Sequence, residues 1–146
     1  MRAQTDWPFV DPPPLPDWLS QEFPFRRRMF YGGRWPMHFV DEGQGPVVLL
    51  QHGNPTWSFL WRKVIRLLAD ANVRVIAPDM VGLGLSAKPR EIGLHSLRFH
   101  ASNLSRLVQA LDLNDMTIVG QDWGGPIVGL MAYYHPERVT GAVFAN

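Results

Sequence analysis

The sequence predicts an α/β domain built on a mostly parallel sheet, and three observations lead to that class. After residue 45, short apolar runs alternate with amphipathic helical stretches, the pattern of parallel strands joined by right-handed crossovers. Residues 47–50 are four apolar side chains in a row, as expected of a strand that is covered on both faces. Residues 116–119 form a further strand-like run, which leads directly into a glycine-flanked turn and an apolar helix.

The chain divides into a Pro-rich segment, residues 1–24, and a core segment, residues 25–146. The first segment includes the run Pro12-Pro13-Pro14, which is extended because proline is excluded from helix interiors. We expect this segment to be an arm on the domain surface, and a proline-rich ligand for a partner protein is the alternative. Residues 26–31 and 37–41 flank Gly32-Gly33 and predict an antiparallel hairpin at the start of the core.

Three helices are predicted from apolar periodicity and from helix stop signals. Residues 57–70 carry apolar side chains at spacings of 4, 3 and 1, which predicts a buried face of Leu60, Val64, Leu67 and Leu68. Residues 97–111 carry a similar stripe of Leu97, Ala101, Leu104, Val108 and Leu111. The third helix covers residues 127–134 and stops before His135-Pro136. Residues 73–77 and the stretch from Val139 to Asn146 predict two further strands.

Composition narrows the class of protein. The hydrophobic fraction of 46% fits a folded globular domain. A net charge of +1 without a long basic run argues against a nucleic-acid-binding face. Cysteine is absent, which excludes disulfides and thiolate metal sites, and the pair Gly82-x-Gly84 lacks the full dinucleotide fingerprint. No apolar run suits a membrane span or a signal peptide. We therefore expect a soluble, cytoplasmic protein with no cofactor, metal, nucleic-acid or membrane partner.

The turn after residues 116–119 reads Gly120-Gln121-Asp122-Trp123-Gly124 and has the form of a nucleophile elbow with a carboxylate at its centre. The glycines leave space where side chains would clash, and the N-terminus of the following helix favours negative charge. Asp122 is therefore the candidate nucleophile. The plainer alternative is that Asp122 only caps the helix.

Hydrogen-bond donors are predicted to lie beside Asp122. The strand at residues 47–51 runs into His52-Gly53-Asn54-Pro55-Thr56, and the carboxyl ends of parallel strands face one crevice. The backbone N–H groups of Trp123 and Asn54 would form an oxyanion hole. The Asn54 amide and the Trp123 indole add side-chain donors suited to a leaving anion. The alternatives are a packed Trp123 bonded to a backbone carbonyl and an Asn54 that only makes a turn.

The motifs His52-Gly53-Asn54-Pro55-Thr56-Trp57-Ser58 and Gly120-Gln121-Asp122-Trp123-Gly124-Gly125 resemble those of the haloalkane dehalogenases of the α/β-hydrolase fold. The resemblance includes Val40-Asp41-Glu42-Gly43 and residues 79–89, and it runs from about Phe23 to the last residue. It implies that Asp122 displaces halide from an alkyl carbon and forms an alkyl-enzyme ester. It further implies that Asn54 and Trp123 bind the halide, and that a histidine with an acidic partner then activates water.

The resemblance also predicts parts that this chain lacks. In the family the cap domain, the base and the acid follow the strand at which the chain stops, so we expect about the first six strands and no cap. None of the five histidines (His38, His52, His95, His100 and His135) occupies the family's base position. We therefore expect no turnover by the chain alone. The strand from Val139 to Asn146 is expected to leave an apolar edge open to a second chain or to self-association.

Two other functions compete with the dehalogenase interpretation. An epoxide hydrolase of the same fold also carries an elbow Asp before Trp, although Asn54 stands where that resemblance usually has an aromatic residue. A truncated, non-catalytic half that serves a second polypeptide is the other alternative.

Overall fold

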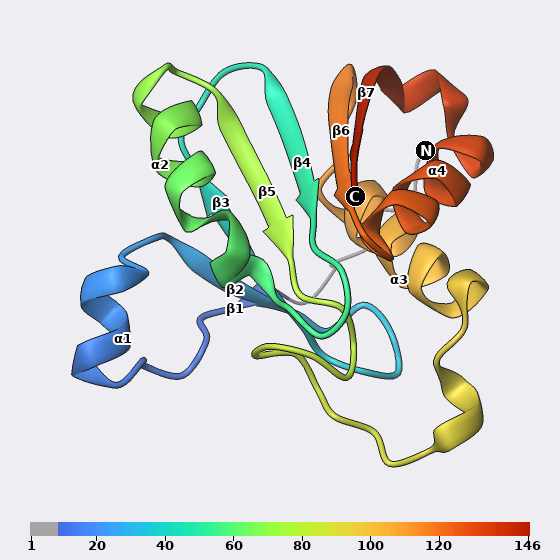
Figure 1. The fold of residues 1–146 in the computed structure, drawn as a ribbon, viewed down its shortest axis with the longest axis horizontal. Helices are drawn as coiled ribbons and strands as arrows, with labels where there is room; N and C mark the ends of the chain where they lie inside the picture. Colours follow the sequence, from blue (N-terminus) through green and yellow to red (C-terminus); the bar gives the residue numbers. More distant parts are fainter. Residues whose placement is uncertain (1–8) are drawn as a thin grey trace, which may run out of the picture.

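The computed structural model describes residues 9–146, which form one mixed sheet with helices on both faces (Figure 1). The seven strands lie in the order β1-β2-β3-β5-β4-β6-β7. They are β1 (Phe9–Val10), β2 (Arg27–Phe30), β3 (Met37–Glu42), β4 (Val47–Gln51), β5 (Arg74–Pro78), β6 (Met116–Gln121) and β7 (Val139–Ala145). The four strands β4 to β7 pair in parallel, whereas β1, β2 and β3 join the sheet antiparallel. The predicted N-terminal hairpin is thus confirmed as β2 and β3.

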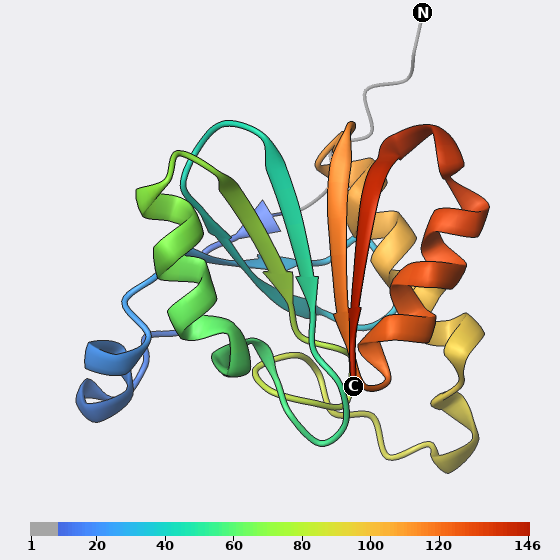
Figure 2. The same cartoon turned by 45° about the horizontal axis from the view of Figure 1, so that its top comes forward.

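The helical elements are α1 (Asp17–Glu22), α2 (Arg62–Asp70), α3 (Leu97–Ala110) and α4 (Gly124–Tyr134), with short 3₁₀ helices η1 (Ser58–Trp61), η2 (Ile92–Leu94) and η3 (Pro136–Arg138). Helix α2 covers one face of the sheet, and α3 and α4 cover the other (Figures 1 and 2). Two hydrophobic clusters fill the spaces between the sheet and these layers. Among residues 9–146, no helix is long and apolar enough to cross a membrane.

The central strands supply side chains to both clusters, which explains their continuous apolar sequence. In β4, Leu49 packs into the cluster under α3 and α4, whereas Leu50 packs into the cluster under α2. Both side chains are fully buried. In β5, Ile76 points to the first cluster and Val75 to the second. The prediction of a strand covered on both faces is therefore confirmed for residues 47–50.

Helix α3 follows the predicted stripe, with Ala101, Leu104 and Val108 fully buried. The side chain of Ser96 caps its first turn by accepting a hydrogen bond from the Phe99 N–H at 3.2 Å. This cap fixes where the helix begins, because it satisfies a backbone donor that has no partner within the helix.

The predicted buried face of residues 57–70 is wrong. Leu60, Val64 and Leu67 are exposed, whereas the fully buried apolar residue of the segment is Ile65, and of the predicted face Leu68 packs against the same cluster. The reason is local: residues 58–61 form the 3₁₀ helix η1, and α2 begins only at Arg62. A 3₁₀ turn advances by three residues rather than 3.6, so a single helical period across the segment assigns the wrong face.

The Pro-rich segment differs from a simple surface arm. Strand β1 pairs with the outer edge of β2, and this seventh strand was not predicted. Leu19 and Phe23, in and after α1, are buried against the α2 side of the sheet. Residues 11–16, which include the three successive prolines, have no regular structure, in line with the expected absence of helix there. Residues 1–8 lie outside the described part of the chain.

Strand β7 lies beside β6, as predicted, and forms the last strand of the described sheet. Six residue pairs between Met116 and Gln121 hold it in parallel register. Its outer edge has no partner within residues 9–146, and Val143 and Phe144 are more than half exposed. The carboxyl end of β7 reaches the elbow, where the Asp122 N–H donates to the Ala145 carbonyl at 3.1 Å.

Candidate active site

The elbow between β6 and α4 holds Asp122 in an uncommon backbone conformation. Its φ of +53° lies in the left-handed region, which non-glycine residues seldom adopt and which concentrates at functional sites. The turn is tight because a Cβ on Gly120 would come within 2.6 Å of Gly125, and one on Gly124 within 2.2 Å of the Gln51 carbonyl oxygen. The two flanking glycines are therefore required by the path of the backbone, as the sequence motif predicts.

The Asp122 carboxylate receives two backbone hydrogen bonds on one oxygen. The Trp123 N–H donates to Oδ2 at 2.6 Å, and the Asn54 N–H donates to the same oxygen at 3.0 Å. These two bonds lower the pKa of the Asp122 carboxyl below its ordinary value, so the group is ionised at neutral pH. Oδ1 accepts no hydrogen bond from residues 9–146. One oxygen is thus held by two donors, and the other is available.

The contact with Asn54 distinguishes Asp122 from a simple helix cap. A capping side chain bonds only to the first turn of its own helix, whereas Asp122 also joins the loop that follows β4. That loop approaches very closely: a Cβ on Gly53 would lie 2.4 Å from the Asp122 Cβ and 2.7 Å from Oδ2. Gly53 is therefore a site residue that the sequence reasoning did not single out. Its place between His52 and Asn54 in the loop motif was the available signal.

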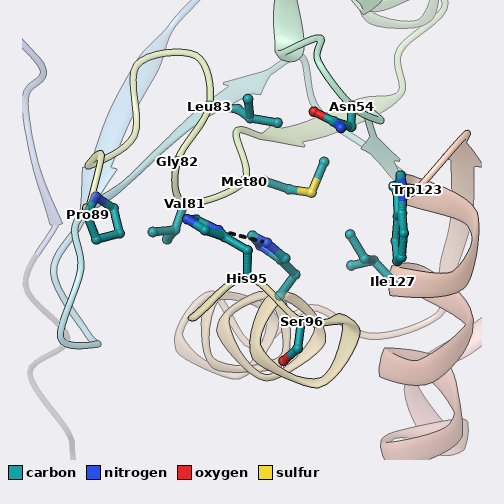
Figure 3. A pocket seen from close by; sticks show the side chains of 11 residues that line it. Asn54, Met80, Val81, Gly82, Leu83, Pro89, His95, Ser96, Trp123 and Ile127 are labelled. Carbon is teal, nitrogen blue, oxygen red and sulfur yellow. Dashed lines mark hydrogen bonds between the residues drawn. The ribbon is translucent and has the colours of Figure 1, made fainter. Parts of the chain in front are cut away.

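The side chains of Asn54 and Trp123 lie at one cavity, of about 420 Å³ (Figure 3). Both residues are exposed, and within residues 9–146 neither the Asn54 amide nor the Trp123 indole N–H has a hydrogen-bond partner. The alternative of a packed Trp123 bonded to a backbone carbonyl is therefore not what the structure shows. Met80, Leu83 and Ile127 make much of the cavity wall apolar.

Asp122 opens onto a second, shallower hollow of about 430 Å³, lined by Asp122, Trp123, Pro126, Ala145 and Asn146. Trp123 lines both hollows. The three predicted site residues thus lie at two neighbouring hollows, with Trp123 in the lining of both, Asn54 at the first and Asp122 at the second. The sequence motifs alone could not reveal that the space beside Asp122 is divided in this way.

No described histidine contacts the Asp122 carboxylate. His52 is buried and engaged at both ring nitrogens: Nδ1 donates to the Gly53 carbonyl at 2.8 Å, and Nε2 accepts from the Met80 N–H at 2.9 Å. His95 and His100 lie 3.4 Å apart at the deeper cavity. Burial, followed by the influence of His95 and His52, lowers the pKa of His100 to about 4. His100 is therefore neutral at pH 7, and His38 is buried against Asp79.

Asp79 is a second buried carboxylate near the site, and sequence reasoning gave it no role. Its Oδ1 accepts from the Ser58 N–H at 2.7 Å, while Oδ2 lies 2.9 Å from both the His38 Nδ1 and the Leu85 nitrogen. Burial raises the pKa of the Asp79 carboxyl, but the hydrogen bonds from His38 and Leu85, together with the charges of His38 and His52, leave the pKa lowered. Its position at the end of β5 was visible in the sequence, but its partners come from β3, η1 and the loop after β5.

The sequence matches the family described as alpha/beta hydrolase fold over residues 46–146, and the chain belongs to this family. It is 45% identical over 126 residues to "Haloalkane dehalogenase 2" of Mycobacterium bovis, covering 86% of this chain and 43% of that protein. It is also 42% identical over 110 residues to "Bifunctional epoxide hydrolase 2" of Sus scrofa, covering 75% of this chain and 20% of that protein.

Among solved structures, the haloalkane dehalogenase DpaA from Paraglaciecola agarilytica superposes with a TM-score of 0.78 at 31% identity. The match covers 92% of this chain and 48% of that one. The chain therefore spans less than half the length of each of these relatives. The fold and the hydrolase family follow from these matches, while the relatives themselves include more than one kind of hydrolase.

Proposed function

We propose that this chain carries the nucleophile and halide-binding half of a haloalkane dehalogenase. The observation that supports it most directly is the Asp122 carboxylate, which has one oxygen bound by two N–H groups and the other unbound. A carboxylate in this state can attack a saturated carbon. The free oxygen forms a C–O bond, the carbon–halogen bond breaks, and the halide departs with the bonding electron pair. The product on the protein is an alkyl ester of Asp122.

The donors beside Asp122 suit a halide as the leaving group. The Asn54 amide and the Trp123 indole N–H are available, and preorganised donors act most strongly where charge develops in the transition state. The apolar wall of the adjoining cavity, formed in part by Met80 and Ile127, suits an alkyl or halogen group. The substrate we propose is therefore a small haloalkane, and the released products are halide and, after hydrolysis, alcohol.

Hydrolysis of the ester needs a base that activates water. Water would attack the ester carbonyl carbon, and the carbonyl oxygen, held by the Asn54 and Trp123 N–H groups, would carry the developing negative charge. Within residues 9–146 no histidine contacts Asp122. We therefore propose that the base and its acidic partner come from outside this chain, as the family resemblance implies.

Epoxide hydrolysis is the second candidate, because an epoxide hydrolase is among the relatives. Attack by Asp122 on an epoxide carbon would leave an alkoxide, which must gain a proton, whereas a halide needs no proton. The Asn54 amide is a weak proton donor, so the site suits a stable anion better. A bromoalkane and an epoxide of similar size separate the two: the adduct on Asp122 carries a hydroxyl group only after epoxide opening.

Stoichiometric alkylation of the 146-residue chain tests the proposal. Incubation with a bromoalkane should add one alkyl mass, located on the peptide that contains Asp122, with release of one bromide. Asp122→Ala should abolish the adduct and leave the circular dichroism spectrum nearly unchanged. Asp115→Ala is the matched control, because Asp115 is also an exposed aspartate with a positive φ, but it precedes β6 instead of following it.

Two results would contradict the assignment. The first is an adduct that survives in Asp122→Ala, and the second is labelling of the chain by a serine-directed fluorophosphonate. A folded wild-type chain that gains no alkyl group would instead favour the alternative of a non-catalytic half.

A further inference from the structure

We propose that Asp79 is a positioning residue that sets the place of the Asn54 N–H opposite Asp122. The proposal concerns the Asn54 loop, residues 52–58, which connects β4 to η1. It rests on the proposed function, since the N–H that Asp79 would position is one of the two that bind the Asp122 carboxylate. The proposal is argued from the hydrogen bonds of the loop to Asp79 and Met80.

Both ends of the Asn54 loop are tied to the end of β5. At the start, the His52 Nε2 accepts a hydrogen bond from the Met80 N–H at 2.9 Å. At the far end, the Ser58 N–H donates to the Asp79 Oδ1 at 2.7 Å. Asp79 and Met80 are adjacent residues directly after β5, so the same short segment binds both ends of the loop.

Inside the loop, the Gly53 carbonyl lies 2.8 Å from the His52 Nδ1, and the Trp57 ring packs against Phe23 and Phe59. Thr56 folds back on the loop itself, with its N–H and Oγ1 bonded to the Gly53 carbonyl at 3.1 and 2.9 Å. Asn54 and Pro55 are exposed. The 3.0 Å bond from the Asn54 N–H to Asp122 therefore depends on how its neighbours in the loop are held, and the two tied ends are part of that support.

The carboxylate of Asp79 is well suited to act as a fixed point. It is fully buried, and its two oxygens accept from elements that are far apart in sequence, namely Ser58, Leu85 and His38. The Asp79 carbonyl also accepts from the Ser86 Oγ, which in turn accepts from the His38 N–H. A buried charge of this kind is retained only when it is paired and hydrogen-bonded. The geometry thus favours a rigid anchor over a solvent-facing acid or base.

A pair of substitutions at Ser58 cuts the proposed link without touching the reacting residues. Ser58→Pro deletes the N–H that donates to Asp79, and proline fits the first position of a helix, where the N–H has no intrahelical partner. The preceding Trp57 is already extended, as a residue before proline prefers. Ser58→Ala removes only the hydroxyl, which has no hydrogen-bond partner among the described residues, and keeps the N–H.

Amide NMR of the 146-residue chain reads out the position of Asn54 directly. In the wild type and in Ser58→Ala, the chemical shift of the Asn54 backbone N–H should follow the ionisation of Asp122. The same N–H should be protected from hydrogen exchange. In Ser58→Pro, the shift should no longer follow that ionisation, and exchange should be about tenfold faster, the factor expected on losing one hydrogen bond. Ile65→Val, a destabilising change in α2, should leave both properties of Asn54 unchanged, which separates positioning from stability.

Asp79→Asn provides a second variant in case Ser58→Pro does not fold. The amide keeps the size of the side chain but offers one acceptor oxygen in place of two, so it cannot accept from both Ser58 and Leu85. In this variant, the Asn54 backbone N–H should partly lose its protection from hydrogen exchange. A backbone N–H of Asn54 that stays protected and still follows Asp122 in a folded Ser58→Pro would overturn the proposal. The same result in Asp79→Asn would overturn it where the Ser58 N–H has lost its protection, because the asparagine oxygen can otherwise replace Oδ1 as the acceptor.

The rate of ester formation on Asp122 in the same variants distinguishes a failure of this inference from a failure of the proposed function. Ester formation on Asp122 should be slower in Ser58→Pro than in Ser58→Ala. If no variant forms an ester, the proposed function fails, while the NMR comparison still decides whether Asp79 positions Asn54.

Discussion

Asp122 combines three features at the scale of a single residue: a left-handed backbone, a doubly bound Oδ2 and an unbound Oδ1. The backbone strain is accommodated because the glycines at 120 and 124 permit contacts that any Cβ would prevent. The two N–H groups bonded to Oδ2 fix the orientation of the carboxylate.

The Trp123 indole N–H offers a direct test of halide stabilisation. Trp123→Phe keeps an aromatic ring and removes the donor, so ester formation from a bromoalkane should slow by ~10²–10³, the cost of one donor at a developing charge. Trp18→Phe is the matched control, since Trp18 lies exposed on α1, away from the site. The alkylation rate, followed by intact mass, measures both variants. A rate for Trp123→Phe within about threefold of wild type would remove the indole from the proposed role.

Strand β7 and helix α2 both expose apolar side chains in the described part of the chain. The outer edge of β7 has no partner, and Leu60, Val64 and Leu67 place apolar surface of η1 and α2 in solvent. Unpaired, apolar strand edges are templates for association with another strand. The elbow is coupled to this edge, because the Asp122 N–H bonds to the Ala145 carbonyl of β7.

Hydrogen exchange of β7 should depend on protein concentration. In dilute solution, residues 139–146 should exchange rapidly where the outer edge faces water, and at high concentration they should gain protection as a second copy pairs with the edge. Exchange by mass spectrometry, alongside sedimentation, measures both effects. Residues 47–51 in β4 serve as an internal control, since β4 pairs on both sides. Strong protection of β7 in a monodisperse, dilute monomer would contradict the expectation.

In the whole described chain, the carboxyl ends of the parallel strands bring the parts of the candidate site together. The ends of β4, β5 and β6 bring together the Asn54 loop, Asp79 and the elbow, which lie far apart in sequence. This arrangement places the proposed nucleophile, Asp122, beside N–H donors from two different loops. It supplies no histidine in contact with Asp122 within residues 9–146.

Reaction of the chain with excess bromoalkane should therefore stop after one event. Bromide release should reach about one equivalent and then level off, because a positioned acid or base accelerates such a hydrolysis by ~10²–10⁴, and within residues 9–146 no histidine is bonded to Asp122. An ion-selective electrode and the intact mass of the protein follow the two products. Asp122→Ala provides the blank. Continued bromide release by the purified chain would show that one of its own histidines acts as the base.

The alternation of strands and helices, the hairpin and the buried stripe of α3 could be predicted from the sequence, because local periodicity reports which face of an element is apolar. The elbow could also be predicted, since Gly120, Asp122 and Gly124 are close together in the chain and their steric demands are local.

The face of α2 was not predictable in this way, because it depends on where η1 ends and which side meets the sheet. Nor were β1, Gly53 and Asp79, whose roles come from contacts across the fold. The close approach of Gly53 to Asp122, and the bonds of Asp79 to Ser58 and His38, exist only once the strand ends lie side by side. Sequence thus determined most of the elements and the candidate nucleophile Asp122, and tertiary structure decided which distant groups hold that residue in place.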